Sequence, residues 1–309
     1  MARSTLISRF FSLPSSRAAE RSRKRVAPLA IIARYAMYAV ILAVFLGPFV
    51  WMFTGSLRRE VEIHGYMFPF QWHTIWPVHW TLKNFADIFG ISADGKQAHL
   101  MFQRGLFNSA LVATSVVGCS LLFNTMAAYF FVRLPFPGKR FLFLFVIATF
   151  MLPSEVTIVP LFLVVNRLHL QNTYWAMIVP FYASPFIVFM LVQFFHSIPK
   201  ELDEAAMIDG ASAWQILWRI VVPNAIPTLT TAALIEFQLI WNLFYWPLIV
   251  TNNPKLQVLQ VMIASQTTDT GTFWGRTFAG MVTAVLPVLV LFLAFQRFFF
   301  RGAVLSGMK

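Results

Sequence analysis

Long apolar runs separated by short polar segments dominate this 309-residue chain. Six of the runs reach the roughly 20 residues that a helix needs to cross a bilayer. They are residues 35–57, 105–132, 141–166, 174–198, 227–250 and 277–296. Four of them carry no charge, the third contains only Glu155, and the fifth contains only Glu236. The pattern predicts an all-α integral membrane protein with six transmembrane helices in residues 28–309, so that both termini lie on the same side.

The composition supports this class. Hydrophobic residues make up 58% of the chain and charged residues only 12%, whereas soluble domains have about 25% charged residues. A formal charge of +12 would indicate a nucleic-acid partner in a soluble protein. Here the charge follows the predicted topology, so we expect no nucleic acid. The single cysteine, Cys119, excludes an internal disulfide and a CxxC redox pair.

The basic residues predict which side the loops face. Sixteen of the 24 Lys and Arg residues lie in the two terminal segments and in the loops after the second and fourth runs, against eight in the other loops. Cytoplasmic loops carry the excess of Lys and Arg. Both termini and the loop 197–227 are therefore expected in the cytoplasm, and the long segment 58–104 outside it.

The N-terminal segment 1–27 is polar and basic, with a cluster at Arg21, Arg23, Lys24 and Arg25. An organellar transit peptide has a similar composition. A disordered cytoplasmic tail that lies on anionic lipid explains the segment equally well. We favour the tail, because the rest of the chain has the features of a bacterial protein.

The loop 197–227 is the most charged interior segment, and its first half predicts a short helix. Pro199 suits a first helical position, where a missing N–H costs nothing. Acidic side chains then follow near the positive end of the helix dipole, at Glu201, Asp203 and Glu204. Asp209-Gly210 supplies a turn, because glycine tolerates a positive φ.

The second half of the loop predicts another helix. Ser212 followed three residues later by Gln215 is a capping-box signal. Apolar residues then recur at helical spacing and predict one buried face, at Trp214, Leu217 and Val221. Pro223 and Pro227 are expected to end this helix.

A spaced motif runs through the same loop. Glu-Ala-Ala at 204–206 is followed by Gly210, Ile220 and Pro223. This spacing resembles the EAA loop of the permease subunits of bacterial ABC importers, in which Leu is usual at the position of Val222. The resemblance implies the type I importer permease fold.

In that family the loop is a coupling helix that docks into a separate ATPase subunit. The resemblance therefore implies that five residues contact the ATPase, namely Glu204, Ala205, Ala206, Asp209 and Gly210. It also implies a second, similar permease (a heterodimer), two ATPase subunits and an extracytoplasmic solute-binding protein. The chain is expected in the bacterial inner membrane, in contact with lipid.

Other segments resemble sugar and glycerol-phosphate permeases, in particular the shorter, maltose-permease-G-like subunit. These segments are 151–160, 170–174, 241–242, 246–249 and 296–302. Leu243 departs from the pattern, because that family often has a polar or acidic residue there. The resemblance implies import of a carbohydrate or a polyol phosphate. A permease for amino acids or peptides is the nearest alternative within the class.

The sequence contains no complete ATP-binding P-loop. Residues 90–96 fit the first part of a P-loop, but Gln97 stands where a Ser or Thr should hold magnesium. We therefore expect no cofactor in this chain, with ATP and magnesium in the partner ATPase. Histidines and tryptophans in 58–104 favour interfacial packing over a metal site, and no catalytic residue is expected.

Two acids within the apolar runs are candidates for a translocation pathway. A carboxylate in hydrocarbon costs several kcal/mol unless it is paired, protonated or facing water. Glu155 and Glu236 are therefore pathway candidates, together with Gln238 and Asn242, which share a helix face four residues apart. Hydrogen bonding between helices explains either acid equally well.

Two other classes of protein remain as alternatives. An ion-coupled secondary transporter would use the two acids as a proton or ion relay, but they lack a chain of partners. A membrane-embedded enzyme would need a catalytic cluster, and His169 and His196 lack acidic neighbours at short helical spacing.

Overall fold

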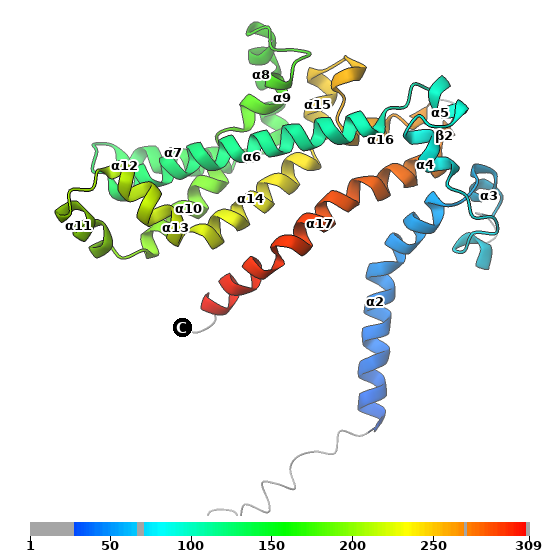
Figure 1. Cartoon of the computed structure of the whole chain (residues 1–309), viewed down its shortest axis with the longest axis horizontal. Coiled ribbons are helices and arrows are strands. Elements are labelled where there is room, and N and C mark those ends of the chain that lie inside the picture. Colours follow the sequence, from blue (N-terminus) through cyan, green and yellow to red (C-terminus); the bar gives the residue numbers. More distant parts are fainter. Residues whose placement is uncertain (1–27, 67–70, 269–270, 307–309) are drawn as a thin grey trace, which may run out of the picture. The chain divides into compact units, whose positions relative to one another are not determined.

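The computed structural model describes residues 28–66, 71–268 and 271–306, with side chains described from residue 31 to residue 296. The basic segment 1–27 and the side chains of 297–302 therefore lie outside the description. The chain divides into two compact units, residues 1–51 and 52–309, and each is described by itself (Figure 1).

The described part of the first unit belongs to helix α2 (Pro28–Ser56). Side chains from residue 31 to residue 51 are exposed around the whole helix, and most of them are apolar. A helix that is hydrophobic all round suits a lipid environment rather than water. This helix confirms the first predicted run.

The second unit is mostly helical. Its short helices before the second long helix are α3 (Glu60–Gly65), η1 (Trp72–Thr74), α4 (Lys83–Ile88) and α5 (Ala93–Gln97). Next come α6 (Phe102–Arg133), α7 (Lys139–Phe150), α8 (Ser154–Arg167), α9 (Tyr174–Ile178), η2 (Val179–Phe181), α10 (Pro185–Ser197) and α11 (Glu201–Ile208). The remaining elements are α12 (Ala213–Ile216), η3 (Leu217–Val221), α13 (Val222–Asn224), α14 (Ile226–Trp241), α15 (Tyr245–Val250), η4 (Pro254–Leu256), α16 (Leu259–Ala264), the antiparallel strands β1 (Thr267–Thr268) and β2 (Gly271–Thr272), and α17 (Trp274–Ser306).

Among the described residues, four helices are long and apolar enough to cross a membrane, and there are six if each of two bent pairs is one span. The four are Ile31–Ser56, Phe102–Arg133, Tyr174–Ser197 and Trp274–Gln296. The first bent pair joins α7 to α8 at 102°, and the second joins Ala213–Asn224 to α14 at 80°.

Helix breaks correct the sequence interpretation of the third and fifth runs. The third run breaks before Pro153, because proline lacks an N–H and pushes the residue before it out of the helical region; Pro160 stays inside α8. The fifth run is no continuous helix to Val250. Helix α14 ends at Trp241, and α15 begins separately at Tyr245.

Helix α6 is the central packing element of this unit. It packs along α10 and α14, and α14 in turn packs against α17 (Figure 1). Two buried hydrophobic clusters lie along it. One contains Val112 and Val116 of α6, and the other contains Tyr129 and Val132 near its end.

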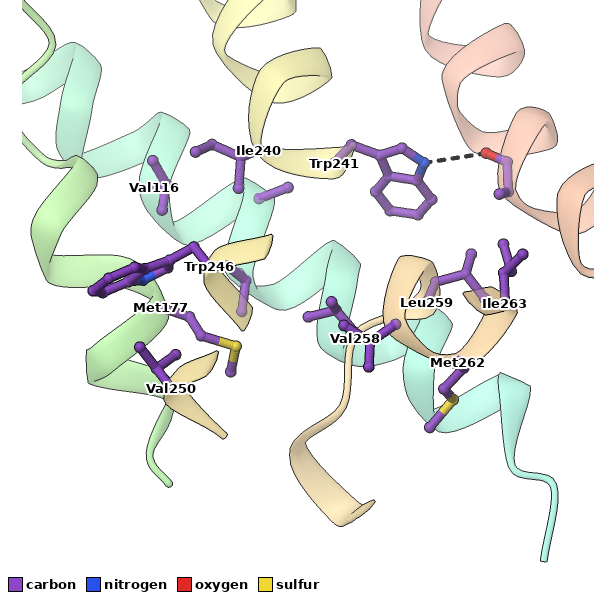
Figure 2. Close-up of a cluster of buried hydrophobic side chains, with 14 of the residues drawn as sticks. Val116, Met177, Ile240, Trp241, Trp246, Val250, Val258, Leu259, Met262 and Ile263 are labelled. Carbon is purple, nitrogen blue, oxygen red and sulfur yellow. Dashed lines mark hydrogen bonds between the residues drawn. The ribbon is translucent and has the colours of Figure 1, made fainter. Parts of the chain in front are cut away.

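Two buried tryptophans connect helices in the first cluster (Figure 2). The indole N–H of Trp241 donates to the carbonyl oxygen of Ala284 in α17 at 3.1 Å. The indole of Trp246 donates to the carbonyl oxygen of Ala176 in α9 at 2.9 Å. The tryptophans of the sequence motifs 241–242 and 246–249 thus bond one helix to the backbone of another.

We predict that these two indoles stabilise the helix packing. Replacing either Trp241 or Trp246 by Phe keeps an aromatic ring but leaves a buried carbonyl without its donor, at a cost of about 1 to 3 kcal/mol. Thermal unfolding of the purified protein in detergent measures the loss. Trp175→Phe is the control, because Trp175 is 57% exposed. Equal midpoints for all three variants would contradict the prediction.

Candidate functional site

The predicted helix–turn–helix forms between α10 and α14. Its first helix, α11, begins at Glu201 with Lys200 as N-cap, so Pro199 lies two residues before the helix and the predicted start was wrong. The first turn holds all three acids. Glu204 points outward and is exposed, whereas the side chain of Asp203 is buried.

The turn after α11 is built by backbone hydrogen bonds around Gly210. The amide of Gly210 donates to Met207 and that of Ala211 donates to Ala206, at 3.0 and 2.9 Å. This is the Schellman arrangement, in which the residue after the C-cap takes a left-handed conformation. Gly210 has φ +81°, so the predicted turn at Asp209-Gly210 is confirmed.

The second helix begins with the predicted capping box. The amide of Ser212 donates to Oε1 of Gln215 at 2.8 Å, and the amide of Gln215 donates to Oγ of Ser212 at 3.3 Å. The helix then passes through a π-helical segment, η3, and ends at Asn224. Pro223 lies inside this helix and does not end it as expected, whereas the helix does end before Pro227, which lies in the first turn of α14. A π turn relieves the clash between a proline ring and the carbonyl four residues earlier.

The helix–turn–helix has an inner face that packs on the second hydrophobic cluster. Leu217 and Val221 are buried there as predicted, and the small side chains of Ala206 and Ala211 pack against the same cluster. Trp214 is 57% exposed, so its assignment to the buried face was wrong. It lies on the outer face instead.

The outer face is apolar as well as acidic. We define it by the exposed side chains of Leu202, Glu204, Met207, Ile208 and Trp214. Ile208 is 87% exposed, at the tip of the turn. Exposed apolar groups on a polar segment mark an interaction surface. The sequence signal was available, because Met207 and Ile208 cannot both face inward on a short helix whose inner face holds Ala206.

The buried acid of α11 is paired with the last residue of α6. Nε of Arg133 lies 2.5 Å from Oδ2 of Asp203, and both side chains are about 95% buried, with 6% and 5% exposed. Burial raises the pKa of Asp203 above its ordinary value, while Arg133 opposes this shift and Glu204 adds to it. In the sequence analysis Arg133 counts only as a basic residue of a loop, because no local sequence pattern indicates a partner 70 residues away.

The polar residues of α14 lie on two sides of the helix. Gln238 and Asn242 are exposed, and the amide of Asn242 donates to the carbonyl oxygen of Gln238 at 2.9 Å. Glu236 is 4% exposed. Its carboxyl contacts the hydroxyls of Ser120 and Ser184, although Oε2 has no hydrogen-bond partner among the described residues. Glu236 therefore joins α14 to α6 and to the segment before α10 in this conformation.

Glu155 has different surroundings. It lies in the first turn of α8, immediately after the break at Pro153, and its side chain is exposed. Oγ of Ser154 donates to its carboxylate at 3.2 Å. A carboxylate near a helix N-terminus is favoured by the helix dipole. The four pathway candidates are thus not brought together in one place.

Polar side chains organise the loops at the opposite end of α6. Oδ1 of Asn172 accepts the amides of Asn252 and Asn253, at 2.7 and 3.2 Å. The hydroxyl of Tyr174 donates to Asn108 of α6 at 2.7 Å. The motif 170–174 therefore fixes the loop after α15. Within the described ranges, no group of three or more His, Cys, Asp or Glu residues could hold a metal ion.

Residues 120–303 match the model of a known protein family, described as the binding-protein-dependent transport system inner membrane component. The chain is 32% identical over 274 residues to the arabinooligosaccharides transport system permease protein AraQ of Halalkalibacterium halodurans, covering 88% of this chain and 93% of that protein. It is 34% identical over 201 residues to the sn-glycerol-3-phosphate transport system permease protein UgpE of Yersinia pestis, covering 64% and 72%.

A solved structure has the same fold. A chain of a bacterial ABC transporter involved in the import of the acidic polysaccharide alginate superposes with a TM-score of 0.75. The superposition covers 89% of this chain and 98% of that one, at 21% sequence identity.

We predict that Glu236 stabilises the packing of α14 more than Gln238 does. Glu236→Leu removes the partner of the buried Ser120 hydroxyl and the half-buried Ser184 hydroxyl and should cost about 1 to 3 kcal/mol, whereas Glu236→Gln keeps a hydrogen-bonding group and should cost less. Gln238→Leu, on the exposed side, is the matched control. Thermal unfolding in detergent measures all three. An unchanged midpoint for Glu236→Leu would rule out a packing role.

Proposed function

The chain belongs to the family of inner membrane components of binding-protein-dependent transport systems, and we propose that it imports a carbohydrate or a polyol phosphate as one of two permease subunits. It is a multi-pass protein of the cytoplasmic membrane and a transport subunit of an ABC importer. The proposal adds the substrate class, the six-span topology and the partners to that identity.

The observation that best supports the proposal is that the loop 197–227 has distinct inner and outer faces. Its inner face is fixed to the spans through Ala206, Leu217 and Val221, and its outer face presents apolar side chains and the Glu204 carboxylate. A surface of this kind suits a cleft in a soluble partner. We propose that the partner is an ATPase subunit, with Glu204, Ala205, Ala206, Asp209 and Gly210 at or beside the contact.

The relatives support the substrate class. AraQ is named for arabinooligosaccharides and UgpE for sn-glycerol 3-phosphate, and both types of solute carry hydroxyl groups. We propose Gln238 and Asn242 as the pathway groups of this chain, because their amides are exposed on α14 and can hydrogen-bond to hydroxyls. Glu155 is a further candidate.

The complete importer contains more than this chain. We propose six spans with both termini in the cytoplasm, a second and different permease, two ATPase subunits and an extracytoplasmic solute-binding protein. ATP and magnesium belong to the ATPases, and this chain carries neither a cofactor nor catalytic chemistry. Closure of the ATPase pair would move the loop 197–227, and the spans would then open the pathway outward as rigid bodies.

Reconstitution of the complex into liposomes tests this function. Candidate binding-protein, permease and ATPase partners are sought among the reading frames that neighbour the gene of this chain, and an arabino-oligosaccharide and sn-glycerol 3-phosphate serve as probes. We expect uptake of one probe that needs internal ATP and the binding protein and is insensitive to a protonophore. Uptake without ATP that collapses with the proton gradient would instead show an ion-coupled transporter. Transport of amino acids or peptides alone would overturn the substrate class.

We predict that the turn at Gly210 is required for coupling. Gly210→Ala forces a side chain into a left-handed backbone conformation, which costs about 1 kcal/mol or more, and so should shift Met207 and Ile208 on the outer face. ATP-driven uptake by the reconstituted complex should fall, while membrane insertion stays normal.

Gly138→Ala is a closely matched control. Gly138 has φ +78°, and like Gly210 it has open space where a Cβ would lie, but it precedes α7 outside the loop. An equal loss of uptake in both variants would show that backbone strain in general, and not the coupling turn, causes the effect.

A further inference from the structure

Arg133, the last residue of α6, contacts both sides of the junction between α10 and α11. Its Nη2 donates to the carbonyl oxygen of Ile198 at 2.9 Å, and Ile198 is the C-cap of α10. Its Nε forms the ion pair with Asp203, in the first turn of α11. One guanidinium thus connects three helices. Nη2 makes a hydrogen bond, whereas Nε makes an ion pair without a hydrogen bond. A planar guanidinium reaches two acceptors from separate nitrogens, whereas a lysine ammonium has a single nitrogen.

The covalent link between α10 and α11 does not fix their orientation by itself. Helix α10 ends at Ser197, and Ile198 is extended, with ψ 124°. Pro199 follows and has no N–H with which to continue a helix, and α11 begins only at Glu201. The junction is therefore a bend of three residues. The Arg133 side chain reaches across this bend and connects α11 directly to α6.

Stability alone does not account for a charged pair at this position. Both side chains are almost completely buried, and removing two charges from water offsets most of their mutual attraction. A hydrophobic pair of similar volume is often as stabilising or more so. The surrounding cluster, with Tyr129, Val132 and Ile198, would accept such a pair. What an ion pair adds is a defined geometry between the two helices.

Helix α6 can carry a displacement far from the pair. It runs from Phe102 to Arg133 and packs against α10, α14, α16 and α9. Near its middle, Asn124 contacts the segment before α10, and Ser120 contacts the Glu236 carboxyl. A shift of the α6 end therefore reaches both hydrophobic clusters and the polar residues between them.

We propose that Arg133 and Asp203 are positioning residues that transmit movement of α11 into α6 during transport. The inference rests on the proposed function, because it assumes that an ATPase moves the outer face of the loop 197–227. Along the chain, α11 is connected to α10 through the bend 198–200. The Arg133–Asp203 pair gives α11 a second, direct connection to a helix 70 residues earlier in the chain.

The experiment uses the complete complex in liposomes with five variants, one of which is Arg133→Lys. Arg133→Gln and Asp203→Asn each remove one charge, and the double variant removes both while keeping polar side chains of similar size. Arg140→Gln removes an exposed charge seven residues after Arg133 and is the matched control. Three quantities are measured for each: the amount of ATPase subunit that copurifies, ATP hydrolysis with and without the loaded binding protein, and uptake per ATP hydrolysed.

We expect each single variant to assemble but to lose at least about fivefold in uptake per ATP, which corresponds to about 1 kcal/mol of coupling. The double variant should be no worse than the singles, because partners in one interaction are not additive. Arg133→Lys should also lose coupling, since it keeps the charge but not the fork. Arg140→Gln should behave as the wild type.

Two outcomes would overturn the inference. One is reduced assembly with normal uptake per ATP in the complex that forms, which would assign the pair a purely structural role. The other is normal coupling in both single variants. Failure of the proposed function has a different signature, because the wild-type complex itself would then show no ATP-dependent uptake and no stimulation of hydrolysis by the binding protein.

Discussion

The second unit depends on polar side chains that repair breaks in its helices. Inside a bilayer, a backbone N–H or carbonyl without a partner costs several kcal/mol. Asn124 of α6 shows how this cost is avoided before α10, where its side chain donates to the carbonyl oxygen of Tyr182 and accepts the amide of Ser184. Helix breaks are tolerated here because a neighbouring span supplies the missing bonds. Because these bonds come from α6, the position of α10 depends on α6.

The sequence predicted the elements whose signals are local. The capping box at Ser212 and the turn at Gly210 each depend on residues within one helical turn, and both are confirmed. Four helices also match apolar runs, because length and hydropathy alone decide whether a segment suits a membrane. The bend at Pro153 was signalled by its residue type, but the 102° angle depends on packing and could not be predicted.

The site was less predictable, because its important contacts join distant residues. No periodicity marks Asp203 as buried or Arg133 as its partner. Trp214 was assigned to the inner face by helical spacing, but Ile216 is the residue of α12 that is buried in the cluster, and Trp214 contacts Trp218 instead. The helical period alone places Glu236 on another side of the helix than Gln238. What each side contacts needed the three-dimensional structure.

The separation of an inner from an outer face in the loop 197–227 has a consequence for exchanging subunits between transport systems. Leu202, Met207, Ile208 and Trp214 are exposed and belong to neither buried cluster, although Trp214 makes an edge contact with Trp218 of its own helix. Ala206, Gly210 and Asp203 have internal roles and leave little freedom for change. Under the proposed function, the preference for one ATPase over another would depend on a few side chains that can be changed independently of the fold. A hybrid importer would then need new residues only on the outer face.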